Sequence, residues 1–273
     1  MARLFYLAIA HRSQAIPGLD TMENILISFM TPNELLNKTW QRSGASILII
    51  GIVGGLLFAG VRGIGIIGPA TYRFVLPAGF LLMILMPFIF LNKEGKRRVG
   101  FVKSNSPKYY LAAVVAGLVL ALLCYGMGLL LFRSSPDNWF ISIKNYYYQS
   151  MNTAGMSLSR LFLIFTVPAL LFSPIGEEIF FRGFLQESLT TKFSYQRSMV
   201  IDSLFFALIH LFHHGIVKDK TGMVQFYPVS GLIWVFLMFI TAMALALLKK
   251  KSGSIYPAIV AHAIFNLIMN LCI

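Results

Sequence analysis

Seven long apolar segments, separated by short polar ones, constrain the fold of this chain more than any other feature. They cover approximately residues 44–61, 72–91, 109–132, 160–186, 198–213, 226–248 and 254–273. A helix of about 17 to 25 apolar residues spans the hydrocarbon core of a bilayer. Hydrophobic residues make up 57% of the chain and charged residues only 12%, which excludes an ordinary water-soluble domain and a disordered chain. The sequence therefore predicts an all-α polytopic bundle of about seven to eight transmembrane helices.

The basic residues predict how this bundle is oriented. The chain has 23 Lys and Arg against 10 Asp and Glu, and many of the basic residues cluster in 92–108 and 249–251, between apolar segments. Such clusters mark cytoplasmic loops, so we interpret them as a topology signal and expect no nucleic-acid partner. Alternation from either cluster places the N-terminus in the cytoplasm and the C-terminus outside. We expect a multi-pass protein of the cell membrane.

Three regions follow from the spacing of the apolar segments. Residues 1–43 contain only short apolar runs and are expected to form an interfacial or cytoplasmic segment. Residues 44–159 are expected to hold accessory transmembrane helices and an outside loop. Residues 160–273 carry most of the polar residues at membrane depth and form the predicted core.

A proline and a glycine interrupt the apolar segment 160–186. Ser173 and Pro174 predict a kink or a helix restart, with Ser173 as the N-cap and Pro174 as the first helical residue. The N-terminus of the restarted helix would then favour negative charge on Glu177 and Glu178.

Acidic residues at membrane depth are rare in this chain. Glu177, Glu178 and Asp202 are the candidates, and an ionisable side chain there usually faces a polar cavity or a partner. Glu178 and Arg182 stand four residues apart in the order that favours a helical ion pair, so we interpret them as a structural pair. Because adjacent helical residues point about 100° apart, Glu177 remains free to face a cavity.

Two further segments carry polar residues at a similar depth. Glu177, His210 and His262 lie roughly 12 to 18 Å from the presumed cytoplasmic ends of their helices, and Asn266 shares a helical face with His262. We therefore expect one site, in a polar cavity that opens toward the cytoplasmic side. A carboxylate and an imidazole can activate water, directly or through a metal, while an imidazole and an amide can stabilise an oxyanion. This set suits amide hydrolysis.

The order of these residues resembles a known family. Glu-Glu-x-x-x-Arg, Phe-x-x-x-His and His-x-x-x-Asn, on consecutive apolar segments between about 160 and 270, are similar to the motifs of the CPBP (Abi) intramembrane proteases, which include the type II CAAX prenyl endopeptidases. The resemblance implies an intramembrane endopeptidase in which water is activated by Glu177 and His210. It implies an oxyanion site of His262 and Asn266. The motif residues Glu178, Arg182 and Phe206 would support them.

The resemblance leaves the cofactor and the substrate open. Either a divalent metal such as zinc is held by Glu177, His210 and His262, or no metal takes part. The expected substrate is a peptide or protein at the membrane, with prenylated CAAX tails as one candidate.

Other interpretations of the same residues remain open. A non-catalytic membrane protein, such as a bacteriocin-immunity factor or a scaffold, could use the same cavity for binding. A proton-coupled transporter could use Glu177 and His210 as a relay, although the chain has no recognisable repeated halves. His213 and His214 are expected near the opposite membrane surface, in an interfacial role.

Overall fold

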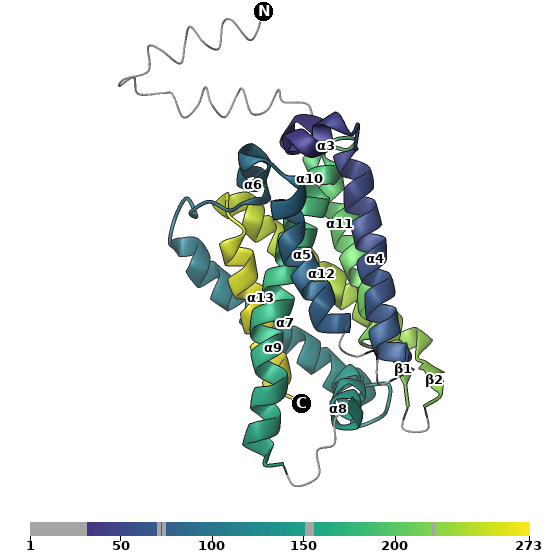
Figure 1. Cartoon of the computed structure of the whole chain (residues 1–273). Coiled ribbons are helices and arrows are strands. Elements are labelled where there is room, and N and C mark those ends of the chain that lie inside the picture. Colours follow the sequence, from purple (N-terminus) through teal and green to yellow (C-terminus); the bar gives the residue numbers. More distant parts are fainter. Residues whose placement is uncertain (1–31, 70–71, 73–74, 151–155, 220–221) are drawn as a thin grey trace, which may run out of the picture.

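The computed structural model describes residues 32–69, 72, 75–150, 156–219 and 222–273, and these form an all-α bundle (Figure 1). Most of the predicted segment 1–43 lies outside the described residues. From Pro32 the chain forms the short 3₁₀ helix η1 (Pro32–Leu35) and the helix α3 (Lys38–Arg42).

Each of the seven predicted apolar segments contains a helix. In chain order, the helices of the bundle are α4 (Ile47–Ile67), α5 (Val75–Phe90), α7 (Lys108–Phe132), α9 (Leu158–Glu178), α11 (Tyr195–Ile209), α12 (Pro228–Ser252) and α13 (Tyr256–Leu271). Between them lie α6 (Lys93–Val99), α8 (Trp139–Ser150), the π-helix η3 (Ile179–Leu185), α10 (Gln186–Leu189) and the 3₁₀ helix η4 (His210–Phe212). A two-stranded antiparallel hairpin, β1 (Ile216–Lys218) and β2 (Val224–Phe226), joins η4 to α12.

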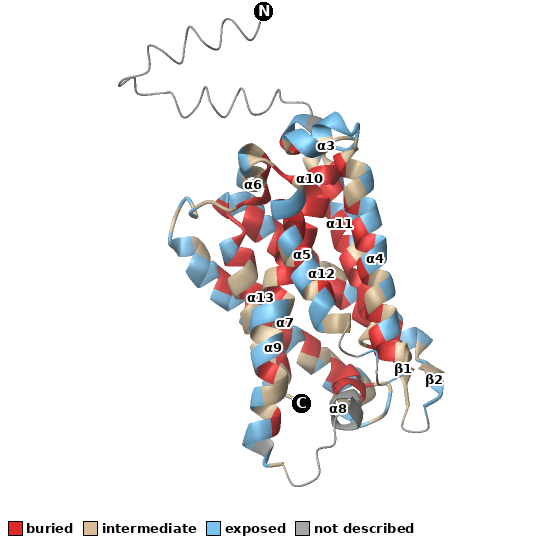
Figure 2. Cartoon of the chain, viewed as in Figure 1, coloured by how far each residue is buried: buried red, intermediate tan, exposed pale blue. Residues whose placement is uncertain are grey.

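The outer surface of the bundle is that of a membrane protein. Among the described residues, four helices are long and apolar enough to cross a bilayer: α4, α7, the continuous helix Ser159–Leu189 and α12. The helices α5 and α13 are apolar but shorter. Exposed leucines such as Leu56, Leu111 and Leu130 face outward, while buried residues face the interior (Figure 2). Such a surface requires lipid rather than water as its surroundings. The predicted helical membrane bundle is confirmed.

The two ends of the bundle differ in composition. One end, here called the basic end, carries α6, the loop 100–107 and the last turn of α12 with Lys249, Lys250 and Lys251. Backbone hydrogen bonds join these parts, from Ile255 N to Gly100 O at 3.0 Å and from Asn105 N to Ser252 O at 3.0 Å. The other end, here called the hairpin end, carries β1, β2, α8 and the C-terminus (Figure 1).

The helix α9 corrects the predicted restart at Pro174. It runs without interruption from Leu158 to Glu178, with Pro168 and Pro174 inside it. Ser173 caps no helix; its hydroxyl donates to Glu177 Oε1 at 3.2 Å, one turn further along. The helix geometry changes only after Glu178, where η3 begins. No helix N-terminus therefore stabilises Glu177 and Glu178, and their charges need other partners.

His214 corrects the predicted interfacial role. Its side chain is fully buried, with Nδ1 2.6 Å from Ser142 Oγ and Nε2 2.8 Å from Ser230 Oγ. These bonds connect α8 and α12 through the turn that follows η4. Because His214 sits in a turn, it points away from the face that a continued helix would have shared with His210. His213 is also partly buried and contacts Arg62 of α4.

The helix α13, which carries two candidate site residues, packs mainly against α7 and α9. Gly117 of α7 permits this close contact, since a Cβ built there would lie 2.3 Å from Ala261 O and 2.9 Å from Ile264 Cβ. A backbone carbonyl cannot move aside as a flexible side chain can. The contact therefore fixes the position of α13.

We expect Gly117→Ala to lower the free energy of unfolding by about 1 to 3 kcal/mol, because the added methyl group overpacks the crossing of α7 and α13. Gly126→Ala is the matched control on the same helix, since a Cβ there meets nothing within 4 Å. It should be neutral or stabilise the helix by up to about 1 kcal/mol. Thermal unfolding in detergent measures both variants; equal melting temperatures would contradict the close contact.

Candidate active site

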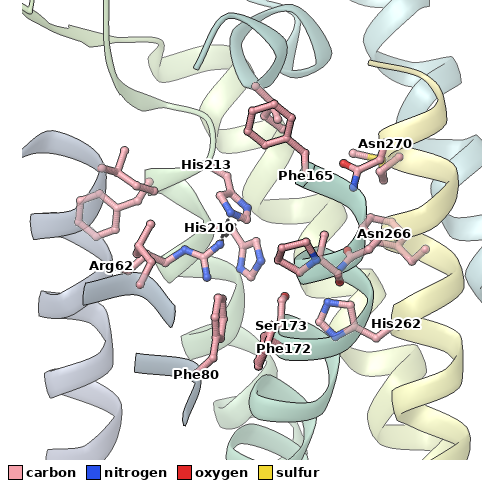
Figure 3. Close-up of a pocket in the computed structure, with 18 of the residues that line it drawn as sticks. Arg62, Phe80, Phe165, Phe172, Ser173, His210, His213, His262, Asn266 and Asn270 are labelled. Carbon is pink, nitrogen blue, oxygen red and sulfur yellow. Dashed lines mark hydrogen bonds between the residues drawn. The ribbon is translucent and has the colours of Figure 1, made fainter. Parts of the chain in front are cut away.

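A cavity of about 450 Å³ lies inside the bundle, between α4, α5, α9, α12 and α13 (Figure 3). Its walls are mainly apolar, formed by residues such as Phe80, Phe165 and Met269. Few polar side chains reach it, and these are Arg62, Ser173, His210, His213, Thr241, His262, Asn266 and Asn270. An apolar cavity with a small number of convergent polar groups is typical of a binding or catalytic site.

The structure brings together three of the four predicted catalytic residues in the cavity wall. His210, His262 and Asn266 all line it, as does the motif residue Phe206. Glu177 and Glu178 do not line it, but each is bonded to residues that do. The third acid expected at membrane depth, Asp202, is fully buried elsewhere, and its carboxylate has no hydrogen-bond partner in the described part of the chain.

Glu177 is held by two residues of the cavity wall. Its Oε1 accepts from Arg62 Nη1 at 3.1 Å and from Ser173 Oγ at 3.2 Å. Its Oε2 is buried and has no hydrogen-bond partner among the described residues. An unpartnered buried carboxylate oxygen is costly unless a water or a ligand completes it. The carboxylate is thus fixed through one oxygen and has an acceptor position available at the other.

Arg62 is the main site residue that the sequence analysis missed. The predicted first span ended at residue 61, which placed this arginine just outside the membrane. In the structure α4 continues to Ile67, so Arg62 is a buried residue within this helix. Its side chain is 3% exposed and bonds both Glu177 and the ring of His213. The signal that could have found it is an isolated basic residue within an otherwise apolar helix, which needs a buried partner.

Glu178 connects two residues that the sequence placed in different motifs. Its Oε2 forms the predicted ion pair with Arg182, four residues further along, at 3.3 Å. Its Oε1 lies 2.8 Å from His262 Nδ1, which donates to it. The adjacent carboxylates therefore contact different partners, as the 100° turn between neighbouring helical residues requires. Glu178 orients His262 so that its Nε2 is the nitrogen left for the cavity.

The Phe-x-x-x-His motif has a direct physical basis. His210 follows the last residue of α11, and its Nδ1 donates to Phe206 O at 2.7 Å, which leaves Nε2 with the lone pair. The Phe206 ring lies 4.3 Å from the His210 ring, and the Arg182 guanidinium lies over the same Phe206 ring at 4.0 Å. Trp234 Nε1 donates to His210 O at 3.1 Å. Phe206 thus orients His210 and contacts the cation that pairs with Glu178.

Asn266 lies one turn beyond His262 on α13. Its Nδ2 donates one hydrogen to Ala169 O on α9 at 2.8 Å. The amide nitrogen carries two hydrogens, so a second donor remains for a group in the cavity. The bond to Ala169 fixes the amide against α9. In Figure 3, Asn266 and His262 lie on the right of the view, and His210 and Arg62 lie to their left.

The cavity extends in a direction that the sequence analysis did not expect. From His262 and Thr241 at its deep end, its lining continues through Phe165, Asn270 and Ile273 toward the hairpin end. The prediction placed the opening on the same side as the basic segments. The distance along a helix gives the depth of a residue, but it does not indicate at which end side chains close the interior of the bundle. Here buried aromatic side chains of η3 close it toward the basic end.

The proposed metal ligands do not fit a zinc site in this structure. Zinc needs three protein ligands that converge at about 2.0 to 2.3 Å. Within the described ranges, no group of three or more His, Cys, Asp or Glu side chains is arranged to hold a metal ion. Glu177 instead receives the Arg62 guanidinium, a cation where the metal would be.

We expect Arg62→Met to lower the free energy of unfolding by about 3 to 5 kcal/mol, because it leaves the buried Glu177 charge uncompensated. Adding Glu177→Gln to Arg62→Met should recover a large part of that loss, since the neutral amide no longer needs a cation. Thermal unfolding of the two single variants and the double variant in detergent gives the coupling energy. Strictly additive losses would contradict the pairing.

One family of known proteins matches the part of the chain that carries most of the candidate site. Residues 159–268, which run from α9 into α13, match the family described as type II CAAX prenyl endopeptidase Rce1-like. Searches of the curated proteins and of the solved structures returned no match. The matched region contains Glu177, His210, His262 and Asn266, whereas Arg62 lies outside it. This part of the chain, the membrane core, is therefore similar to the type II CAAX prenyl endopeptidases of the CPBP (Abi) family.

Proposed function

We propose that this protein is an intramembrane endopeptidase that hydrolyses a peptide bond inside the cavity described above. The observation that carries the proposal is Glu177, a buried carboxylate that is fixed through Oε1 and whose Oε2 has no hydrogen-bond partner in the part of the chain that the structure describes. A general base must be held in place and must have an acceptor site free for the proton it removes. Glu177 meets both conditions beside a cavity that can hold a peptide.

In the proposed mechanism, Glu177 Oε2 and His210 Nε2 hold a water molecule against the scissile carbonyl. Glu177 accepts a proton as the water oxygen bonds to the carbonyl carbon. Arg62 pairs with Oε1 of this carboxylate and so leaves the second oxygen for the water. The same proton is then delivered to the leaving amine as the carbon–nitrogen bond breaks, which restores the Glu177 carboxylate.

The oxyanion formed in the first step is stabilised by His262 and Asn266. In this role both ring nitrogens of His262 carry hydrogen, so that Nδ1 donates to Glu178 and Nε2 donates to the oxyanion. Asn266 supplies its second amide hydrogen from the same helical face. Pre-oriented donors of this kind contribute strongly to catalysis because they need no reorganisation during the reaction.

We expect Glu177→Gln to reduce cleavage by about 10²- to 10⁴-fold, because the amide cannot accept the proton. The assay uses purified full-length protein and a pool of quenched-fluorescent peptides with an apolar anchor, including a farnesylated Cys-a-a-X peptide. His210→Gln should show a similar loss, while Glu34→Gln, at the far basic end on η1, should not.

Folding of each variant is checked by gel filtration in detergent. Parent-level cleavage by a folded Glu177→Gln protein would contradict the mechanism. Full cellular function of that variant would instead support the non-catalytic binding interpretation, since binding does not need a base.

Glu178 is a positioning residue in this mechanism, because it acts through His262. We expect Glu178→Gln to lower kcat by about 10- to 100-fold with little change in KM, since an uncharged amide accepts a weaker hydrogen bond from His262 Nδ1 and orients the ring less firmly. The neighbouring exchange, Glu177→Gln, is the matched comparison and should cost more. A change confined to KM would contradict this role.

A further inference from the structure

Basic side chains gather at one end of the bundle far more than at the other. The described Lys and Arg side chains at or next to the basic end are Lys38, Arg42, Lys93, Lys96, Arg97, Arg98, Lys103, Lys108, Lys192, Arg197, Lys249, Lys250 and Lys251. Those at the hairpin end are Arg133, Lys144, Arg160 and Lys218. Short segments rich in Lys and Arg stay in the cytoplasm during insertion. The basic end is therefore the cytoplasmic end.

Aromatic side chains close the bundle between the candidate site and the basic end. Phe180, Phe181 and Phe184 of η3 are at most 1% exposed and pack against one another. They belong to a hydrophobic core that also contains Val99 of α6. A peptide that approached from the basic end would have to displace this core.

A cluster of ion pairs lies at the basic end, beyond the aromatic residues, and joins α6, α10 and α12. Lys249 Nζ of α12 lies 3.0 Å from Glu187 Oε1 and donates to Arg182 O at 2.6 Å. Arg98 Nε of α6 lies 3.4 Å from Glu187 Oε2. Separating these groups would leave buried charges uncompensated, which is costly. The cytoplasmic end is thus closed by both packing and charge.

The cavity, in contrast, reaches the hairpin end. Its lining includes Phe165 near the start of α9, Val217 of β1, and Asn270 and Ile273 at the end of α13. None of the residues that line it belongs to α3, α6 or α10 at the basic end. The polar groups of the candidate site therefore lie at the inner limit of a cavity directed away from the cytoplasm.

We infer that the substrate enters from the extracytoplasmic side, as a membrane-anchored peptide with apolar residues around the cleaved bond. This inference rests on the proposed endopeptidase function. The apolar walls, such as Phe165, Pro168 and Met269, suit apolar side chains, and the depth of His262 requires the cleaved bond to lie within the membrane region. A prenylated C-terminal tail in the cytoplasm faces the closed end and is not the substrate.

Thiol labelling tests the direction of the cavity without a substrate. Cys124 and Cys272 are replaced by Ala in the full chain, and single cysteines are introduced as Asn270→Cys in the cavity, Met223→Cys at the hairpin end and Lys103→Cys at the basic end. Met223 is 62% exposed, and Lys103 is also exposed. A small sulfonated maleimide that cannot cross the membrane is applied to right-side-out and to inverted vesicles.

We expect Asn270→Cys and Met223→Cys to be labelled in right-side-out vesicles and Lys103→Cys only in inverted ones. Labelling of Asn270→Cys from the same side as Lys103→Cys would overturn the inference. So would labelling of Lys103→Cys in right-side-out vesicles, or a failure of Asn270→Cys to react from either side.

A cleavage experiment separates this inference from the proposed function. The anchored peptide pool is added to right-side-out or inverted vesicles that contain the parent protein or Glu177→Gln. We expect cleavage by the parent protein in right-side-out vesicles only, lost in Glu177→Gln. Cleavage only in inverted vesicles would overturn the direction but leave the function. Outer-face labelling of Asn270→Cys without cleavage in either orientation would overturn the function but leave the direction.

Discussion

Two adjacent buried carboxylates, Glu177 and Glu178, determine how the rest of the core is arranged. A carboxylate inside a membrane protein needs a cation or several donors, because its own helix cannot supply enough stabilisation. Glu177 obtains them from Arg62 on α4, and Glu178 from Arg182 and from His262 on α13. The two acids thus tie α9 to helices that lie far from it in the sequence.

These pairings also divide the chemical roles of the two acids. Glu178 Oε1 accepts from His262, and its Oε2 lies in the ion pair with Arg182 although it accepts no hydrogen bond from the described residues, so this residue is placed to orient His262. Within the described ranges, Glu177 is hydrogen-bonded through Oε1 and not through Oε2. The guanidinium of Arg62 both compensates the charge of Glu177 and leaves its second oxygen available. The proposed base is therefore selected by its partners rather than by its depth or its position on the helix.

Much of the fold and of the site could be predicted from patterns within single helices. The apolar segments gave the helices, and spacings of four residues gave the Glu178–Arg182 pair and the shared face of His262 and Asn266. Their similar depth also predicted that His210 and His262 meet at one cavity. Other features that depend on packing between helices were predicted wrongly or missed. Pro174 did not end α9, because packing within the bundle can keep a proline-containing helix continuous. Arg62 was missed because its role depends on a partner 115 positions away.

By itself, the sequence determined that this chain is a helical membrane bundle and which polar residues it places at membrane depth, because lipid allows only segments that satisfy their own backbone hydrogen bonds. Tertiary structure alone decided which partner on another helix each buried charge meets, as with Glu177 and Arg62, and which end of the cavity is closed. Both depend on contacts between segments such as η3 and α6, where the packing of Phe184 and Val99 decides whether space remains. Such contacts leave no periodic pattern in the sequence.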